Sequence, residues 1–78
     1  MEWTYANQRY STEVVRDQNA GYAAVELYRT AATMRERIAR VVFWDAQGQL
    51  FIETFGTEVP LIVAQKLIDE AKGIIMTG

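Results

Sequence analysis

The side chains best suited to chemistry in this chain are two glutamates in apolar surroundings. Glu26 and Glu53 lie in runs rich in apolar and aromatic residues, where they could face each other across a strand. Glycoside hydrolysis uses two carboxyl groups about 5 to 10 Å apart in a cleft. A chain of 78 residues leaves little room for such a cleft. We therefore interpret these acids as solvated or salt-bridged, and we predict that the protein is not an enzyme.

A second group with chemical potential consists of four arginines close together in the sequence. Arginines beside an aromatic sheet can stack on bases and contact phosphates, as in proteins that bind single strands. A solvated loop whose arginines pair with nearby acids is the simpler interpretation, and we favour it. Nucleic-acid binding is therefore the alternative hypothesis, and the net charge of −2 disfavours it. The four residues are Arg29, Arg35, Arg37 and Arg40.

Several catalytic and ligand-binding chemistries are excluded by the residues that the chain lacks. The sequence has no histidine and no cysteine, and Ser11 is its one serine. Pairs of a nucleophile with histidine, thiolate catalysis and the usual zinc or haem sites are thereby ruled out. The glycines are isolated from one another and form no phosphate loop, and the acids lack the spacing of a calcium loop. We predict no cofactor and no metal site.

The composition predicts one small domain over residues 1–78. Half of the residues are apolar, about a quarter are charged and one is proline, which is typical of a folded chain. At this length the stability is marginal, so a partner that buries more surface would help. The absence of cysteine indicates a reducing compartment. No leader-like segment or run of eighteen apolar residues occurs, so we expect no membrane span and a cytoplasmic location.

Turn residues and apolar spacing predict the elements that position these side chains. Residues 18–21 form a turn cluster between strand-like runs at 10–16 and 22–29. Residues 45–48 suit a type I turn followed by a left-handed glycine, and they join runs at 38–44 and 49–55. Apolar residues then recur at helical spacing over 58–72, with Thr57 as the N-cap and Gly73 at the end.

The fold class that follows is α+β. We predict an antiparallel meander of three to four strands with one C-terminal helix packed on one sheet face. The segment 20–42 is ambiguous because its apolar residues also fit a period of 3.6. The alternative is a long central helix at 20–40, a β-hairpin at 41–55 and the C-terminal helix. We prefer strands at both ends of this segment, with residues 30–36 as the connection.

Alternation within the two hairpins predicts which side of the sheet the helix covers. We pair Trp44 with Leu50 across the second turn, and Val14 with Ala23 across the first. One face then has no charge at its centre, so we expect it to be the core. Its members are Val14, Ala23, Val25, Leu27, Val42, Trp44, Leu50 and Ile52.

The opposite face mixes aromatic residues with glutamates, a composition that a bare surface rarely shows. It is covered either by another chain or by residues 3–5 folding over it. We predict a small interaction module that binds a protein partner, or itself as a homodimer, through this aromatic and acidic face. The candidate interface residues are Tyr22, Glu26, Tyr28, Val41, Phe43, Phe51, Glu53 and Phe55.

Overall fold

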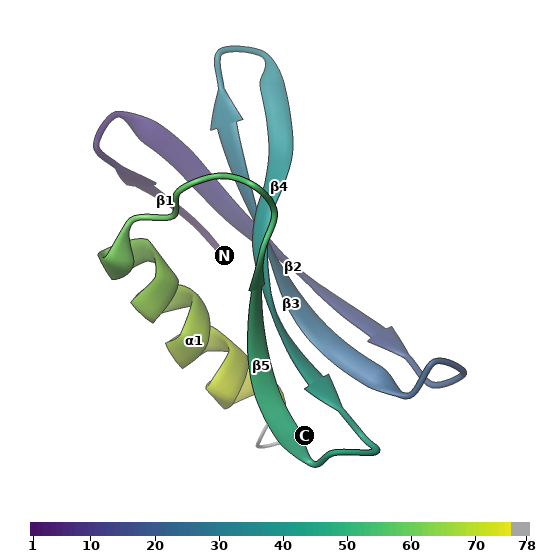
Figure 1. The fold of residues 1–78 in the computed structure, drawn as a ribbon. Coiled ribbons are helices and arrows are strands. Elements are labelled where there is room, and N and C mark those ends of the chain that lie inside the picture. The colour runs from purple at the N-terminus through teal and green to yellow at the C-terminus, as the bar shows by residue number, and fades with distance from the viewer. Residues whose placement is uncertain (76–78) are drawn as a thin grey trace.

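The computed structural model describes residues 1–75, which form one antiparallel sheet and one helix. The five strands lie side by side in chain order, and the helix follows the last of them (Figure 1). This confirms an α+β meander with a C-terminal helix, although the strands number five and not three to four. The elements are β1 (Glu2–Tyr5), β2 (Gln8–Asp17), β3 (Tyr22–Ala31), β4 (Met34–Trp44), β5 (Gln49–Thr54) and α1 (Leu61–Ile75).

Two of the hairpin turns lie where glycine and turn residues predict them. Gly21 has a φ of 76° and ends the β2–β3 turn, in which the Asp17 carboxylate accepts a hydrogen bond of 2.9 Å from the Ala20 N–H. Gly48 has a φ of 64° and ends the β4–β5 turn. The N–H of Gly48 donates to the carbonyl of Trp44 at 2.9 Å. Positive φ is costly for other residues, so glycine favours both reversals.

The centre of the chain is a hairpin, so the alternative with a long helix at 20–40 is wrong. Ala31 pairs with Met34, which leaves a two-residue turn in place of the predicted connection over residues 30–36. Ala32 has a φ of 55° in that turn. The helix-forming alanine, glutamate and arginine side chains here lie in strands, because pairing with neighbours on both sides outweighs a weak local preference.

The N-terminal segment is a strand and does not fold over the second face of the sheet. β1 pairs with β2 through a turn in which Ala6 and Asn7 both have positive φ, 52° and 66°. Trp3 stacks on Tyr10 of β2 with the ring centroids 6.2 Å apart. Both rings pack in the core on the side of the helix. The hypothesis that residues 3–5 cover the aromatic face is therefore wrong.

A β-bulge in β4 changes which of its residues share a face. Leu27 pairs with Ala39 but Tyr28 pairs with Arg37, so Ile38 is an extra residue opposite β3. Without the bulge, strict alternation would place Arg37 and Arg40 on opposite sides of the sheet. With it, both arginines face away from the helix, while Ile38 and Ala39 are both buried in the core.

The helix begins at Leu61, after Pro60, and not at residue 58. The carbonyl of Pro60 accepts the first helical hydrogen bonds, from the N–H groups of Val63 and Ala64. Because proline disfavours helical geometry in the residue before it, the helix cannot extend backwards. It also continues through Gly73 to Ile75, which packs against the core. No helix within residues 1–75 is long and apolar enough to span a membrane.

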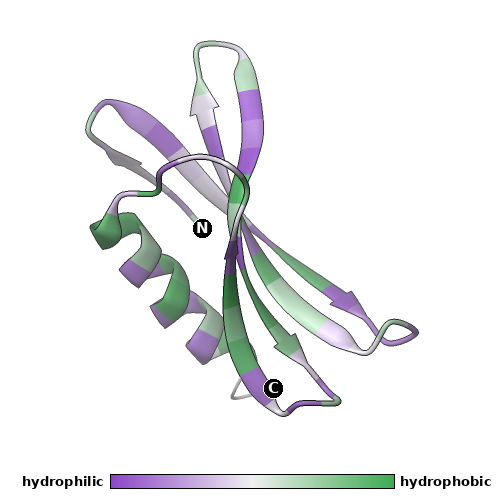
Figure 2. Cartoon of the chain, in the orientation of Figure 1, coloured by the Kyte–Doolittle hydropathy of each residue, from purple (hydrophilic) through white to green (hydrophobic). Residues whose placement is uncertain are grey.

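The core lies between α1 and the side of the sheet that faces it, and apolar residues line both (Figure 2). The predicted pairing of β4 with β5 is wrong by one residue, since Trp44 pairs with Gln49 and Val41 with Ile52. Val42 and Trp44 therefore face away from the helix, and Ile52 at the edge of the sheet stays 49% exposed. The buried core consists of Tyr10, Val25, Leu27, Ile38, Ala39, Val41, Val63, Leu67 and Ala71.

Candidate interaction surface: the open face of the sheet

The side of the sheet that points away from α1 is the candidate functional surface, and we call it the open face. Alternation along β2 to β5, with the bulge in β4, determines its members. α1 and Val59, in the loop before it, pack on the opposite side. The residues of β2 to β5 on the open face are Arg9, Ser11, Glu13, Val15, Asp17, Tyr22, Ala24, Glu26, Tyr28, Thr30, Arg35, Arg37, Arg40, Val42, Trp44, Gln49, Phe51 and Glu53, and Phe55 follows β5 on the same side.

The structure brings six of the eight candidate interface residues together on the open face. Val41 and Phe43 are the exceptions, because the one-residue error in pairing reverses the faces of β4. Val41 is buried in the core, and Phe43 lies on the same side of the sheet. The six that share the open face are Tyr22, Glu26, Tyr28, Phe51, Glu53 and Phe55.

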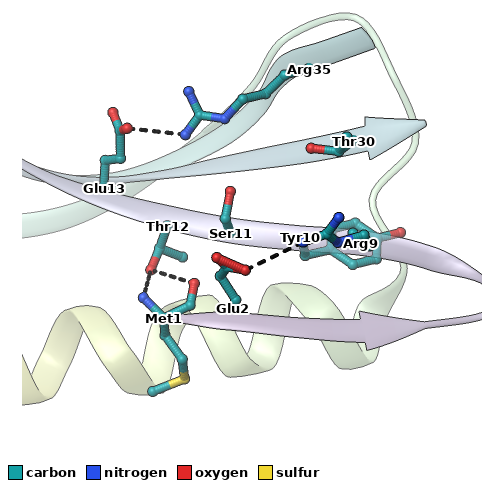
Figure 3. A pocket seen from close by; sticks show the side chains of 9 residues that line it. All are labelled: Met1, Glu2, Arg9, Tyr10, Ser11, Thr12, Glu13, Thr30 and Arg35. Carbon is teal, nitrogen blue, oxygen red and sulfur yellow. Dashed lines mark hydrogen bonds and ion pairs between the residues drawn. The ribbon is translucent and has the colours of Figure 1, made fainter. Parts of the chain in front are cut away.

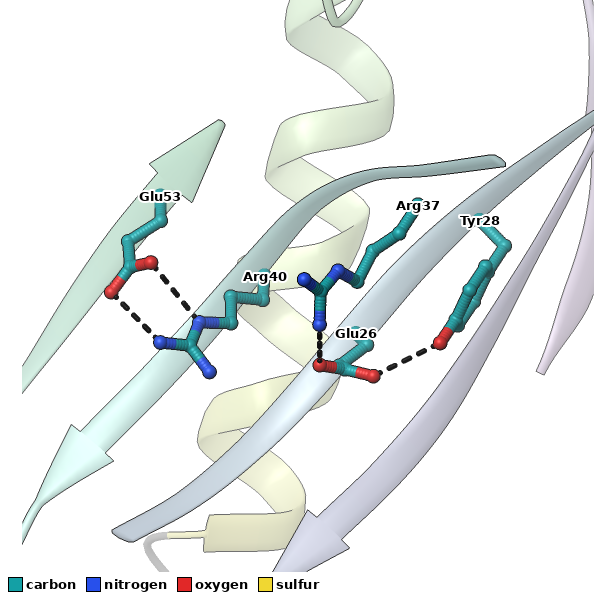
Figure 4. Close-up of polar contacts among 5 residues, drawn as sticks. All are labelled: Glu26, Tyr28, Arg37, Arg40 and Glu53. Carbon is teal, nitrogen blue, oxygen red and sulfur yellow. Dashed lines mark hydrogen bonds and ion pairs between the residues drawn. The ribbon is translucent and has the colours of Figure 1, made fainter. Parts of the chain in front are cut away.

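Arg40 is held by the residues directly across from it on both neighbouring strands. Its Nε and Nη2 atoms donate to the two carboxylate oxygens of Glu53 at 3.1 and 3.2 Å (Figure 4). Its guanidinium carbon lies 5.5 Å from the centre of the Tyr22 ring. The hydrogen bonds with Glu53 raise the pKa of Arg40 above its usual value. A two-pronged contact of this kind fixes the plane of the guanidinium.

Glu26 is a buried acid, 7% exposed, and two side chains bind its carboxylate. Arg37 Nη1 donates to one oxygen at 2.7 Å, and the Tyr28 hydroxyl donates to the other at 3.0 Å (Figure 4). Arg37 also lies over the ring of Phe55, with its guanidinium carbon 4.4 Å from the ring centre. A carboxylate removed from water needs such partners, since an unpaired one would cost several kcal/mol.

Burial and the neighbouring carboxylate act on the phenol of Tyr28. Desolvation, followed by the hydrogen bond to Glu26 and the charge of Glu26, raises the pKa of Tyr28 above its usual value. A phenolate at this position would face a carboxylate with little water between them. The neutral hydroxyl is therefore favoured, and it keeps its role as a donor to Glu26.

Arg35 repeats the same arrangement near the turn between β3 and β4. Its Nη2 donates to Glu13 at 3.0 Å, and its guanidinium carbon lies 3.7 Å from the centre of the Tyr28 ring. Arg9 of β2 also lies on the open face, and it pairs with Glu2 at 3.7 Å. The other three arginines that residues 1–75 place on this face are on β4, and each contacts one glutamate and one aromatic ring. Their charges cancel those of the three acids, so the face is close to neutral.

A small apolar layer lies at the other end of the open face. Tyr22 and Trp44 are directly paired, and their ring centroids are 5.1 Å apart. Beside them, Ala24 and Val42 are completely buried although no helix covers them. Phe51, the partner of Val42 on β5, is 41% exposed. This end of the face therefore combines covered aliphatic groups with accessible aromatic rings.

The four arginines considered for nucleic-acid contact do not form a connecting loop. Arg35, Arg37 and Arg40 lie on β4, whereas Arg29 lies on β3 and points to the side of the helix. Arg29 contacts Glu36 and donates to the hydroxyl of Thr57 at 3.1 Å, and the hydrogen bond with Glu36 raises its pKa. All four guanidinium groups contact a carboxylate. Such pairing leaves little free positive charge for phosphates.

A polar groove of about 410 Å³ lies beside β1 and β2 (Figure 3). Two ion pairs close its sides, Glu2 with Arg9 at 3.7 Å and Glu13 with Arg35 at 3.0 Å. Ser11 lies in this groove, but the sequence offers no histidine to activate it. In the described part of the chain, no three acidic side chains gather where they could hold a metal ion.

Sequence reasoning missed several residues that shape the open face. The sequence predicts Trp44 and Val42 in the core, and it predicts Arg35 in a connection over residues 30–36 and not in a strand. The spacing of the basic residues held a usable signal, because three of them share one strand with β-branched and aromatic residues.

Comparison of the chain with protein-family models, with curated proteins and with solved structures gives no match.

Proposed function

We propose that the protein is a non-enzymatic interaction module that binds another protein chain through the open face. The observation that carries this proposal is the network on β4, in which each arginine contacts a glutamate and an aromatic ring. Arginine and aromatic residues are the types enriched at protein interfaces and at their energetic hot spots. Here they are already held in place, which lowers the entropic cost of binding.

The charge balance of the open face supports a protein ligand over a nucleic acid. Phosphate backbones reward unpaired cations, whereas the three arginines of β4 on this face contact Glu13, Glu26 and Glu53, and Arg9 contacts Glu2. A protein surface can instead pack on the rings and bond to the outer edges of the ion pairs. The accessible ring of Phe51, with Tyr22 and Trp44 beside it, supplies apolar area for such a contact.

A pair of neighbouring valines allows the proposal to be tested with a matched control. Val15 lies on the open face opposite Ala24, whereas Val14 lies on the other side opposite Val25. Wild-type protein, Val15→Glu and Val14→Glu are each immobilised and exposed to an extract of the native host, and the retained proteins are quantified. We expect a protein retained in near-equal amount by the wild type and Val14→Glu but lost with Val15→Glu. Equal retention by all three would contradict the proposal.

A further inference from the structure

The edge strands of the sheet differ in how well they are protected against pairing with another chain. An exposed edge offers unpaired N–H and C=O groups, and proteins commonly block such edges with short strands or charged side chains. β1 is short and begins with Glu2. The part of β2 that extends beyond β1 carries Glu13, Arg16 and Asp17. Both of these edges are therefore blocked.

The other edge strand, β5, has no such protection from residues 1–75. It reads QLFIET and contains no lysine or proline, and its one charged group, Glu53, is bound by Arg40 of its own chain. Phe51 is 41% exposed on the open face, and Ile52 is 49% exposed on the side of the helix. This hydrophobic stretch runs along the free edge of the sheet (Figure 2). Apolar groups are thus exposed on both sides of one strand.

The backbone of β5 also presents hydrogen-bonding groups to the outside. The N–H of Phe55 donates to the carbonyl of Ile38 across the β4–β5 pair at 3.0 Å. In an antiparallel pair such inward-pointing residues alternate with outward-pointing ones. The N–H and C=O groups of Leu50, Ile52 and Thr54 therefore point away from β4.

We infer that β5 pairs antiparallel with β5 of a second copy, so that the two five-stranded sheets join into one. A two-fold axis perpendicular to the sheet keeps both helices on the same side. Paired residues share a face, so each residue of β5 pairs with one an even number of positions away in the second copy. One residue of β5 must then pair with itself, and the axis passes beside it. With the axis at Phe51, the two Phe51 rings meet on the open face and Leu50 meets Ile52 of the second copy. With the axis at Ile52, Phe51 would instead meet Glu53 of the second copy. The apolar matches select the axis at Phe51.

This dimer goes beyond the proposed function and does not depend on it. Pairing uses the edge of β5, whereas Val15, Tyr22 and Tyr28 of the open face lie on β2 and β3. The joined sheet would present two open faces side by side to one partner. A variant at Ile52, on the side of the helix, can disrupt the dimer without altering the open face, so the two ideas can fail separately.

Single cysteines test the register, because the natural chain has none. Opposed Phe51 residues form a pair without direct hydrogen bonds, with their Cα atoms about 4.5 Å apart, which permits a disulfide. Two Ile52 residues are offset by two positions along the strands, so with the spacing between strands their Cα atoms are about 8 Å apart, too far for a disulfide. Under mild oxidation we expect Phe51→Cys to give a covalent dimer and Ile52→Cys to stay monomeric. A covalent dimer of the Ile52→Cys variant, or no covalent dimer of either variant, would overturn the register.

Sedimentation equilibrium tests the dimer itself. The wild type should sediment with the mass of two chains at micromolar concentration, and Ile52→Lys should raise the dissociation constant by more than about tenfold. Val14→Lys is the matched control, because Val14 is 47% exposed on the same side of the sheet. It should leave the dimer intact, and circular dichroism should show both variants folded. A monomeric wild type, or a dimer disrupted by Val14→Lys but not by Ile52→Lys, would overturn the inference.

Discussion

Arg40 and Glu53 lie directly opposite each other on β4 and β5 and share two hydrogen bonds, of 3.1 and 3.2 Å. The bulge at Ile38 places Arg37 on the same face as Arg40, so this ion pair shares the face with the pair of Arg37 and Glu26. That face consequently contains acids and bases that satisfy each other within one chain. No partner is needed to neutralise its glutamates, so a partner is free to use its rings and its outer polar edges.

The first prediction concerns Glu26, the buried acid of this network. Glu26→Ala removes the acceptor of both Arg37 and Tyr28, so we expect the free energy of unfolding to fall by about 1.5 to 3 kcal/mol. Urea denaturation measures this change. Glu2→Ala is the control, since Glu2 and Arg9 are both largely exposed and their pair should contribute less than about 0.5 kcal/mol. Equal losses would show that the Glu26 contacts contribute nothing special.

The second prediction concerns the phenol of Tyr28 at alkaline pH. In the unfolded chain the phenol of Tyr28 ionises near pH 10, whereas in the folded protein burial and Glu26 raise the pKa of Tyr28 above that value. The stability linked to this shift is fully present below about pH 10 and is lost as the pH rises through the folded pKa. Tyr28→Phe should therefore show a smaller loss of melting temperature above pH 10 than the wild type. Tyr5→Phe controls for the loss of an exposed hydroxyl, and identical alkaline profiles for Tyr28→Phe and the wild type would contradict the prediction.

The third prediction concerns the core beneath α1. Leu27 is completely buried between the sheet and the helix, so Leu27→Ala should lower the free energy of unfolding by about 2 to 5 kcal/mol. A domain of this size could lose most of its stability. Leu61, at the start of the helix, is 85% exposed, and Leu61→Ala should have little effect. Thermal melts of both variants decide whether the buried side of the sheet is correctly identified.

The fourth prediction concerns the turn between β3 and β4. Ala32 adopts a φ of 55°, which costs a residue with a Cβ atom roughly 1 to 2 kcal/mol relative to glycine. We expect Ala32→Gly to raise the free energy of unfolding by about 1 kcal/mol after the greater freedom of the unfolded chain is counted. Ala46→Gly in the β4–β5 turn serves as the comparison, because Ala46 is not among the residues with positive φ. A gain from Ala46→Gly as large as that from Ala32→Gly would argue against the strained turn.

The fifth prediction concerns nucleic acid, the alternative ligand for the arginines. Titration with labelled single- and double-stranded oligonucleotides should show no salt-sensitive binding at physiological salt, because the guanidinium groups already contact carboxylates. The double variant Arg35→Ala, Arg37→Ala should leave this result unchanged. Binding that weakens with added salt and disappears in the double variant would support the nucleic-acid hypothesis instead.

The sequence predicted the strand faces well in one hairpin and poorly in the other, and the size of the register error explains the difference. Val14 was paired with Ala23 and in fact pairs with Val25, an error of two residues that preserves the faces. Trp44 was paired with Leu50 and in fact pairs with Gln49. A shift of one residue moves every side chain of a strand to the other face.

Two further features had weak signals in the sequence. β1 is four residues long, and Ala6 and Asn7 adopt positive φ in the turn that follows it. Glycine at these positions would have indicated a hairpin. The bulge at Ile38 depends on burying both Ile38 and Ala39 against α1, a requirement set by packing and not by local preference. That bulge places Arg35 and Arg37 on the same face as Arg40 and the three glutamates, which is why the composition suggested the acids and bases but not their geometry.

The most direct test of binding through the open face is hydroxyl-radical footprinting, which reports the exposure of individual side chains. The isolated chain is compared with the chain bound to the protein that it retains from the host extract. We predict slower oxidation of Tyr22 and Tyr28 in the complex, with Leu61 and Ile62 of the helix unchanged. Protection of Leu61 and Ile62, with Tyr22 and Tyr28 oxidised as fast as in the isolated chain, would contradict binding through the open face.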